Sequence, residues 1–495
     1  MLFSLIITAV AAIAPAQDTL QADAPTVLTL EQALQIALSE NVSVKVADKE
    51  IERTGYARKG TYAALYPQVD GSGAFQRTIK KQVMYMDGDG FDFSKMIAET
   101  MGAFVAPLYA QHPGLTPPSL STGESSSSSS NDGISVGRWN TWSLGVTAGM
   151  PVINAQLWQS LKLSDLDVEL AVEKARSSRL ETVTQVKQAF FSVLMARQSF
   201  EVYKSVYENA LENLQNTEKK YKVQKASDLD LARAKTTLAN AIPSVYDAEN
   251  AIMLSLWQLK AVMGLNLDAN IDVAGSLNDY AEHLLFDLNE SSQTGLEGNS
   301  TLRQLEMQAQ QLAQTVKLRQ YANLPTISLG FSYSMNAMAN DFKFNEYQWS
   351  PYSYVGLTLS IPIFAGGKRA NDIKQARVQA AELDMQRTNT ERQLKISIRQ
   401  YLNTMETAMK TYTAAQSAVE SAEKAYDIAV KSYNVGRSTL TDLNDAQLAL
   451  TQAQMGVCQA IYSFVTAKAN LEGTIGADFI DEDGNVQLNK TYDNN

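Results

Sequence analysis

The residues that most often carry enzyme chemistry are scarce in this 495-residue chain. It has two histidines, His112 and His283, and one cysteine, Cys458. The histidines lie in unrelated polar segments and Cys458 lies inside a helical pattern, so a metal site of the usual His/Cys kind has almost no ligands to draw on. A lone cysteine also excludes an intrachain disulfide. We therefore predict a protein that is not an enzyme, with no catalytic residues, no cofactor and no metal.

Two adjacent glycines offer another chemical possibility. Gly366 and Gly367 precede a helix with a basic start, as they would in a phosphate-binding loop. No Lys-Ser or Lys-Thr loop follows a buried strand here, so a bend between a strand and a helix is the better interpretation. The formal net charge of −11 argues against nucleic acid as a partner.

Very long helices are the elements expected to position the polar groups of any functional site. The segment 368–435 contains neither glycine nor proline, and as one helix it would be about 100 Å long. Its apolar residues recur every three or four positions, which is typical of a narrow coiled-coil seam. The segment 152–242 also lacks both residues and predicts two antiparallel helices with a turn near 225–228. Taken alone, this pattern leaves a solvated cytosolic coiled coil open.

The N-terminus indicates export. Residues 2–13 are mostly apolar and are followed by Ala14-Pro15-Ala16, a small-x-small cleavage pattern, which predicts a signal peptide over 1–16. The alternative is a buried apolar N-terminal helix. After residue 17 no apolar run approaches the ~20 residues that a membrane helix requires, so any crossing of a membrane must use strands.

Four segments have the period-two pattern of strands: 69–76, 142–150, 327–334 and 355–361. In the second, apolar residues alternate with small or polar ones, which is typical of a membrane barrel strand. Residues 78–137 include a run of serines and predict an extracellular loop. Five aromatic residues lie near the strand ends that face the long loops, as an interfacial aromatic girdle would: Trp139, Trp142, Trp349, Tyr352 and Tyr354. The alternative is that they are ordinary strand aromatics.

The chain also repeats itself. Residues 299–325 repeat 41–67 at an offset of 258, and Tyr433 repeats Tyr221 at an offset of 212. Each unit is predicted to hold a helix, two strands and a long helical hairpin, and the first helix should begin after Thr29 with a capping box. The predicted organisation is a signal peptide (1–16), a first repeat (17–264), a linker (265–298), a second repeat (299–476) and a polar tail (477–495).

Four strands cannot close a barrel, since about eight is the practical minimum, so other copies must contribute strands. The duplicated units, the junctions Leu324-Pro325 and Ile361-Pro-Ile-Phe-Ala-Gly-Gly367, and the turn from Tyr433 to Asp445 together resemble the TolC-like outer membrane efflux family. The resemblance covers residues 28–476. It implies a mainly α fold with a membrane β part, in which a homotrimer forms a twelve-stranded β-barrel in the outer membrane and a twelve-helix α-barrel in the periplasm.

The resemblance also implies a function. The chain would be the passive exit duct of a tripartite efflux or type I secretion system, docked to a periplasmic adaptor and an inner-membrane transporter. The alternative is a periplasmic coiled-coil adaptor without a channel, which predicts one long hairpin flanked by soluble β domains. The doubled hairpin and the four membrane-type strands favour the duct.

The same resemblance implies a role for two aspartates near the second turn. Asp442 and Asp445 match the family's acidic pair at the periplasmic constriction, and the i,i+3 spacing places both on one helix face. Three copies would form two carboxylate rings, which favour cations. The alternative is ordinary capping chemistry in a solvated turn.

Two further sets of residues follow from the family pattern. Tyr433 and Asp230 match a pair that ties neighbouring hairpins shut. The family's partner arginine is Ser438 here, with Arg437 one place earlier, which puts the charged part of that tie in question. The turn residues expected to contact the adaptor are Val223, Leu229, Val435, Gly436, Leu440 and Leu443.

Overall fold

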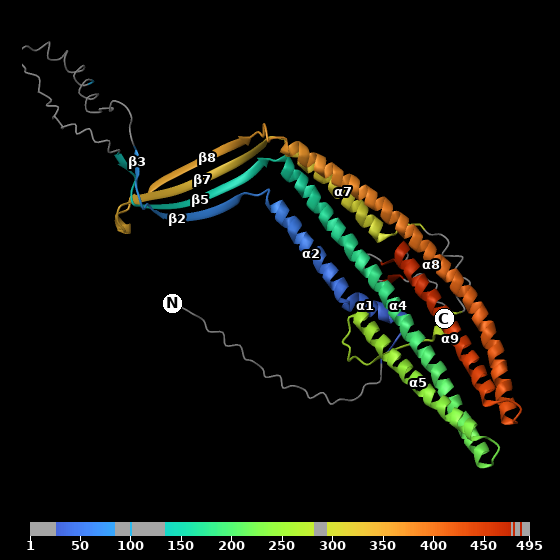
Figure 1. Cartoon of the computed structure of the whole chain (residues 1–495). Helices are drawn as coiled ribbons and strands as arrows, with labels where there is room; N and C mark the ends of the chain where they lie inside the picture. The colour runs from blue at the N-terminus through green and yellow to red at the C-terminus, as the bar shows by residue number, and fades with distance from the viewer. Residues whose placement is uncertain are drawn as a thin grey trace, which may run out of the picture. The chain divides into compact units, whose positions relative to one another are not determined.

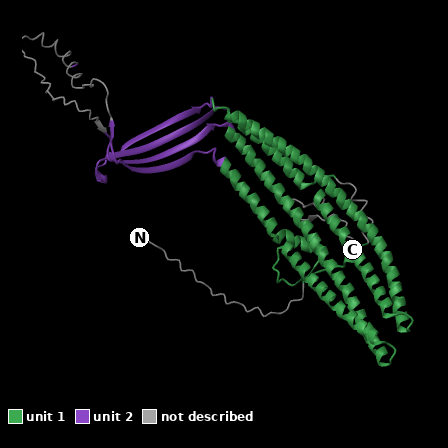
Figure 2. Ribbon diagram, viewed as in Figure 1, with its two compact units in different colours: residues 1–61, 156–323, 364–495 green, residues 62–155, 324–363 purple. Residues whose placement is uncertain are grey.

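The computed structural model describes residues 26–84, 100, 134–281, 295–476, 479–480 and 486–487. The chain divides into two compact units (Figure 2). The helical unit comprises residues 1–61, 156–323 and 364–495, and the sheet unit comprises residues 62–155 and 324–363. The predicted signal peptide, the serine run, both histidines and most of the predicted tail lie outside the described residues.

Two long antiparallel hairpins dominate the helical unit (Figure 1). The first consists of α4 (Ala155–Lys222) and α5 (Asp228–Met263), and the second of α8 (Lys368–Asn434) and α9 (Leu440–Ile475). The shorter elements are β1 (Thr26–Leu28), α1 (Leu30–Glu40), α2 (Val42–Ala63), β6 (Ile271–Val273), η1 (Leu277–Tyr280), α7 (Ser300–Tyr321), β9 (Phe479–Ile480) and β10 (Val486–Gln487). None of the helices in the described part of the chain combines the length and hydropathy needed to span a membrane.

The first helix begins as the sequence predicts but does not continue unbroken. Thr29 and Gln32 form the capping box at its start. Asn41 then separates α1 from α2, because its side-chain oxygen accepts a hydrogen bond from the backbone N–H of Ser43 at 2.7 Å and so starts a new helix. The Asn41 amide also donates to the carbonyl oxygen of Val262 in α5 at 2.6 Å. The cap is local, whereas the contact with Val262 that holds the break against α5 is not visible in the neighbouring sequence.

α5 ends at a glycine, Gly264, which lies against the backbone of Glu40 and Asn41. Gly264 has φ of 77°, in the left-handed region, and a Cβ at this position would lie 2.5 Å from the carbonyl oxygen of Glu40. A side chain is therefore excluded twice, by the backbone conformation and by the space available.

The same junction occurs in the second half of the chain. Asn299 donates from its amide to the carbonyl oxygen of Thr474 in α9 at 2.6 Å, and its side-chain oxygen caps α7. Gly476 ends α9 with φ of 70°, and a Cβ there would lie 2.4 Å from the carbonyl oxygen of Gly298. The duplication visible in the sequence therefore recurs in the hydrogen bonds of these two junctions.

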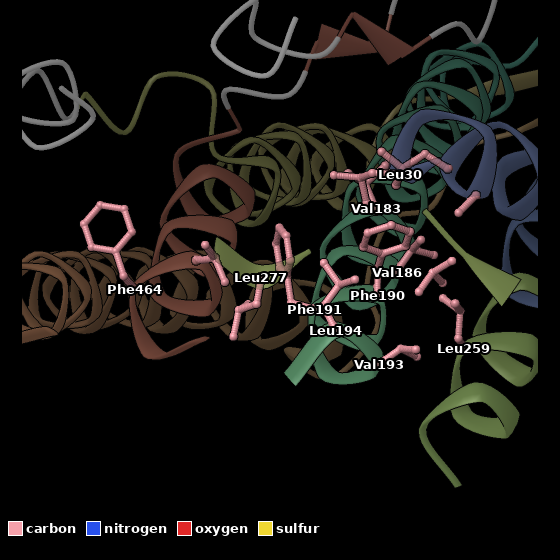
Figure 3. Close-up of a cluster of buried hydrophobic side chains, with 14 of the residues drawn as sticks. Leu30, Val183, Val186, Phe190, Phe191, Val193, Leu194, Leu259, Leu277 and Phe464 are labelled. Carbon is pink, nitrogen blue, oxygen red and sulfur yellow. The ribbon is translucent and has the colours of Figure 1, made fainter. Parts of the chain in front are cut away.

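The main hydrophobic core lies where these short elements meet the long helices (Figure 3). Phe190, Phe191 and Leu194 of α4 are buried among Leu259 of α5 and Leu277 of η1 (Figure 3). Residues from β1, α1, β6, α8 and α9 complete the cluster. The long helices away from this region bury only narrow stripes, as the seam pattern predicts; in α8 the buried residues are Ala376, Leu383, Ile398, Met405, Ala408 and Tyr433.

Charged groups are buried beside this core. The ammonium group of Lys187 in α4 lies 2.8 Å from a carboxylate oxygen of Glu472 in α9, and Lys187 is completely buried. Lys468 approaches the other carboxylate oxygen of Glu472 at 3.8 Å. Because a mispaired charge in this environment is costly, these contacts favour one alignment of α4 against α9.

The sheet unit contains four long antiparallel strands in the order β2-β5-β7-β8. They are β2 (Gln68–Arg77), β5 (Asn140–Ile153), β7 (Thr326–Ala339) and β8 (Ser350–Ser360). The predicted strands 69–76, 142–150 and 327–334 lie within the first three. The fourth predicted strand, 355–361, misses the first half of β8, which begins at Ser350 and ends before Ile361. Short pieces β3 (Gln82–Met84), β4 (Ile134–Val136) and η2 (Phe344–Glu346) lie beyond the long strands.

The register of the sheet separates apolar and polar side chains onto opposite faces. Val146 lies opposite Gly71 and Tyr333, and Ala148 lies opposite Val69 and Phe331. We call this the apolar face; it continues through Trp142, Leu144, Met150, Leu329, Met335, Val355, Leu357 and Leu359. The other face carries mainly small or polar residues: Gln68, Asp70, Ser72, Ser143, Gly145, Thr147, Ser328, Ser332, Ser334 and Thr358.

The predicted aromatic girdle is partly wrong. Tyr354 pairs with Ser332, and Tyr352 pairs with Ser334, so both tyrosines lie on the polar face of the sheet. A girdle must face the same side as the apolar residues, and of the three predicted girdle residues in the long strands only Trp142 meets that condition.

Candidate functional site at the two helical turns

The two hairpins end in turns of the same construction (Figure 1). Turn 1 (residues 223–227) joins α4 to α5, and turn 2 (residues 435–439) joins α8 to α9. In turn 1 the backbone N–H of Gln224 donates to the carbonyl oxygen of Tyr221, and in turn 2 Gly436 donates to Tyr433 in the same way. Both residues have positive φ, 59° for Gln224 and 76° for Gly436. The second copy thus has glycine where the first accepts a strained side chain.

Each turn ends in a capping box that contains an aspartate. In turn 2 the carboxylate of Asp442 accepts from the backbone N–H of Thr439 at 2.8 Å and from its hydroxyl at 2.7 Å. These bonds hold the pKa of Asp442 below its usual value, with the backbone bond the larger cause. In turn 1, Ser227 lowers the pKa of Asp230 in the same way, chiefly through its side-chain hydrogen bond. Both aspartates are therefore ionised at neutral pH.

The acidic pair of the second turn is available to solvent. Asp442 and Asp445 are both exposed and lie one turn apart near the start of α9. Asp442 performs the capping chemistry that was the alternative explanation, yet its charge remains accessible. Capping and a role in a carboxylate ring are therefore compatible for this residue.

Tyr433 forms a link between the two hairpins, and we use the name Tyr433 link for its contacts with α4. Its hydroxyl shares a hydrogen bond of 2.7 Å with the hydroxyl of Thr217. The ammonium group of Lys220 donates to the backbone carbonyl of Tyr433 at 2.8 Å and lies 3.9 Å from the centre of its ring. Burial lowers the pKa of Lys220.

Within one chain Tyr433 and Asp230 have other partners, and their tie across neighbouring hairpins stays a prediction. Tyr433 bonds to Thr217, and the Asp230 carboxylate accepts instead from Ser227. In turn 1 the equivalent tyrosine, Tyr221, donates to Asp228 within its own hairpin at 2.6 Å. Sequence reasoning missed Thr217 and Lys220, because a partner on another helix cannot be identified from the spacing within one segment.

Polar contacts continue this connection between α5 and α9. The Arg233 guanidinium donates to the Thr441 hydroxyl at 3.3 Å, and the Asn444 amide donates to the Thr237 hydroxyl at 3.2 Å. Each bond of this kind contributes only about 0.5–1.5 kcal/mol net. The hairpin ends are therefore held by several weak links rather than by an extensive core.

The residues predicted to contact a partner separate into two groups. Val223, Leu229 and Val435 are exposed, with 70% of the Val435 surface accessible, and Gly436 and Arg437 are exposed beside them. The prediction is wrong for Leu440 and Leu443, which are 2% and 0% exposed. They pack against Tyr433 and Ala234 inside the hairpin ends and have no surface to offer.

Within the described residues, no group of three or more His, Cys, Asp or Glu side chains is arranged to hold a metal ion. Cys458 is buried in α9, and burial raises the pKa of its thiol to about 11.

A family model and several relatives match this chain. The model described as outer membrane efflux protein matches residues 117–265 and 292–477, more than half of the chain, and each segment contains one hairpin. The outer membrane protein TolC of Vibrio cholerae is 21% identical over 342 residues, which are 68% of this chain and 76% of that protein. TolC of Escherichia coli is 21% identical over 352 residues, covering 68% of this chain and 70% of that protein.

Solved structures share the fold. The Campylobacter jejuni CmeC outer membrane channel superposes with a TM-score of 0.65 at 18% identity, covering 99% of this chain and 96% of that one. The open state of the Neisseria gonorrhoeae MtrE outer membrane channel gives a TM-score of 0.64 at 15% identity, covering 90% and 88%. The expected mainly helical fold with long helices and antiparallel strands is confirmed.

Proposed function

Since the chain belongs to the outer membrane efflux protein family, and is therefore an outer membrane channel, we propose that three copies form one duct whose periplasmic entrance is built from turns 1 and 2. As a member of this family the chain is a transport protein that extends into the periplasm, and not an enzyme.

The two faces and the two edge strands of the sheet support assembly from several copies of the chain. The apolar face fits lipid, and the polar face fits a water-filled interior. β2 and β8 are the edge strands of the sheet within one chain. An unpaired backbone group in lipid costs several kcal/mol, so each edge strand requires a partner strand from a neighbouring copy. Three copies would supply the twelve strands expected from the sequence.

The second hairpin supports the same assembly. A groove between α8 and α9 is lined mainly by small and polar residues, among them Thr404, Ala408, Thr411, Gly456 and Ser463. Many apolar residues of α8 are also exposed in the single chain, including Val378, Met385 and Ile428. Helices of a neighbouring copy would cover these surfaces.

The Tyr433 link would keep the entrance narrow at rest, because it ties the second hairpin to the first. Thr217→Val combined with Lys220→Ala should raise single-channel conductance several-fold in planar bilayers. The two lost contacts together contribute about 2 kcal/mol per copy, enough to shift a closed tip toward open. Lys219→Ala is the matched control, since Lys219 is exposed and adjacent in sequence.

These recordings also test the channel proposal itself. Purified protein should give discrete conductance steps, and the double variant should give larger ones. Equal conductance of the double variant and the Lys219 control would place the constriction elsewhere. The absence of steps from both wild type and double variant would contradict a duct entered at the turns.

The partners are proposed to be a periplasmic adaptor and an inner-membrane transporter. Their contact would be made by the exposed Val223, Leu229, Val435 and Gly436, where small or aliphatic groups permit close approach. Membership of an efflux family supports a partner, since a passive duct contains no energy source of its own.

Gly436→Arg should abolish efflux that depends on this channel while leaving its assembly intact. A Cβ at Gly436 meets no atom within 4 Å, so the arginine would project outward into the proposed contact. Gly436→Gln is the control, because Gln224 already occupies the equivalent left-handed position in turn 1. Drug susceptibility of cells that rely on the channel is the measurement; normal resistance with the arginine variant would exclude docking at turn 2.

A further inference from the structure

Loops and aromatic side chains cover one end of the apolar face. In β2, β5, β7 and β8, the strand ends that lead to helices lie together at one end of the sheet. The connections between strands lie at the opposite end, where Phe75 and Trp142 stack at 4.3 Å and Phe344 packs edge-on against Trp142 at 4.8 Å. We call this opposite end, with residues 77–84, 134–140 and 339–350, the outer rim.

Hydrogen bonds fix the rim in place. Asn140 is 1% exposed and donates from its amide to the carbonyl oxygen of Asp341 at 2.9 Å. The Tyr347 hydroxyl donates to the same carbonyl at 2.6 Å. The backbone N–H of Trp139 donates to the side chain of Asn340 at 3.3 Å. The loop that carries Phe342 and Phe344 is therefore held against the strands before any ligand arrives.

Positive charge is concentrated on this rim. Its five cations are Arg77, Lys80, Lys81, Arg138 and Lys343, and its carboxylates are Asp341 and Glu346, in a chain whose net charge is −11. Arg77 lies 5.4 Å from the ring centre of Phe342, and the Lys81 ammonium lies 4.8 Å from that of Trp139. The sheet register places Arg77 on the same face as Phe75, so its charge stands at the end of the apolar face.

Apolar side chains accompany these charges in solvent. Ile79 is 96% exposed, and Phe342 and Phe344 are 54% and 49% exposed. Exposed aromatic and aliphatic groups interleaved with Lys and Arg are the composition expected at the boundary between acyl chains and anionic headgroups. A soluble protein partner would not require these cations to stand directly above a lipid-facing surface.

We propose that the outer rim binds the phosphorylated headgroup of a lipid in the outer leaflet. Arg77, Lys81 and Lys343 contact phosphate, while Ile79 and the aromatic side chains contact the upper acyl chains. Arg77 supplies a planar guanidinium that can donate two bonds to one phosphate. The inference rests on the outer-membrane location of the channel and is independent of what happens at turns 1 and 2.

Native mass spectrometry of the detergent-purified whole protein tests the proposal, with diphosphoryl and monophosphoryl lipid A as probes. Wild type should retain the diphosphoryl form more strongly. Arg77→Gln, Lys81→Gln and Lys343→Gln combined should weaken its binding about 100-fold, because each cation near an anionic lipid contributes roughly a fivefold gain. The matched control neutralises Lys395, Lys410 and Lys424, three exposed lysines of α8.

Each outcome bears on the proposal. Weakened binding in the rim variant with unchanged binding in the α8 variant supports it. Equal loss in both variants would show a general effect of net charge and would overturn it, as would equal retention of the two lipids by wild type. Ile79→Ser should weaken both lipids without changing the phosphate preference. Stronger binding of a polyglutamate peptide than of either lipid would assign the rim to an acidic protein instead.

Discussion

Asp442→Asn combined with Asp445→Asn should lower the preference of the channel for cations over anions by more than tenfold. One carboxylate about 5 Å from a passing ion contributes roughly 0.8 kcal/mol even at the dielectric constant of water, which is close to fourfold. Three copies would place six such groups at the entrance, so screening by salt leaves a large effect. Reversal potentials in planar bilayers with a salt gradient measure the preference directly.

The main competing explanation is fraying of turn 2, since Asp442 also caps α9. Thr439→Ala removes the same capping box without changing the charge, so it should leave the ion preference intact. Asp230→Asn neutralises the capping aspartate of turn 1, as Asp442→Asn does in turn 2. If the Thr439 variant loses selectivity as fully as the doubly neutralised channel, the aspartates act through the turn and not through their charge.

The pH dependence of selectivity follows from the lowered pKa of Asp442. A carboxylate whose pKa is depressed in the folded state keeps its charge, and its contribution to stability, above the ordinary value of 3.8. Both are lost only as the pH falls below that value through the folded pKa. Selectivity should therefore be constant from pH 8 to about pH 4 and should decline only in more acidic solution.

Gly476→Ala should destabilise the helical unit by about 2–5 kcal/mol. Left-handed backbone costs an alanine roughly 1–2 kcal/mol, and overpacking typically adds 1–3, since the new Cβ would lie 2.4 Å from the Gly298 carbonyl oxygen. Gly264→Ala should have a similar effect against Glu40. The free energy of unfolding from denaturant titration, or the apparent Tm if unfolding is irreversible, is the measurement.

Glycine substitution has a built-in control in α2. Gly55 lies inside the helix, and a Cβ there meets nothing within 4 Å, so Gly55→Ala should stabilise the protein by about 0.5–1 kcal/mol. Equal tolerance of alanine at Gly55 and Gly476 would contradict the close approach at the two junctions.

The sequence was most informative where structure depends on neighbouring residues. The capping box at Thr29 and the C-terminal glycines Gly264 and Gly476 are local signals, and each marks a helix end. The period-two pattern of 142–150 likewise predicted which side chains share a face. These elements follow from backbone geometry and side-chain periodicity, which a single segment contains in full.

Features that depend on another segment could not be predicted. Asn41 bonds to Val262 and Tyr433 bonds to Thr217, and in each pair the two residues are more than two hundred positions apart in the sequence. The position of Leu440 and Leu443 beside a turn predicts surface residues, yet the facing helices bury them. Asp442 and Asp445 lie at the start of α9, directly after turn 2, and only the capping bonds of Asp442 show that one group can serve both purposes.

The mass of the intact particle tests the central claim most directly. One chain offers a four-stranded sheet with two open edges and helices with exposed apolar stripes, so the account requires neighbours of the same kind. Native mass spectrometry of the detergent-solubilised protein should give the mass of three mature chains, with no stable single-chain species. A particle that contains one chain and still conducts ions across a planar bilayer would contradict the account.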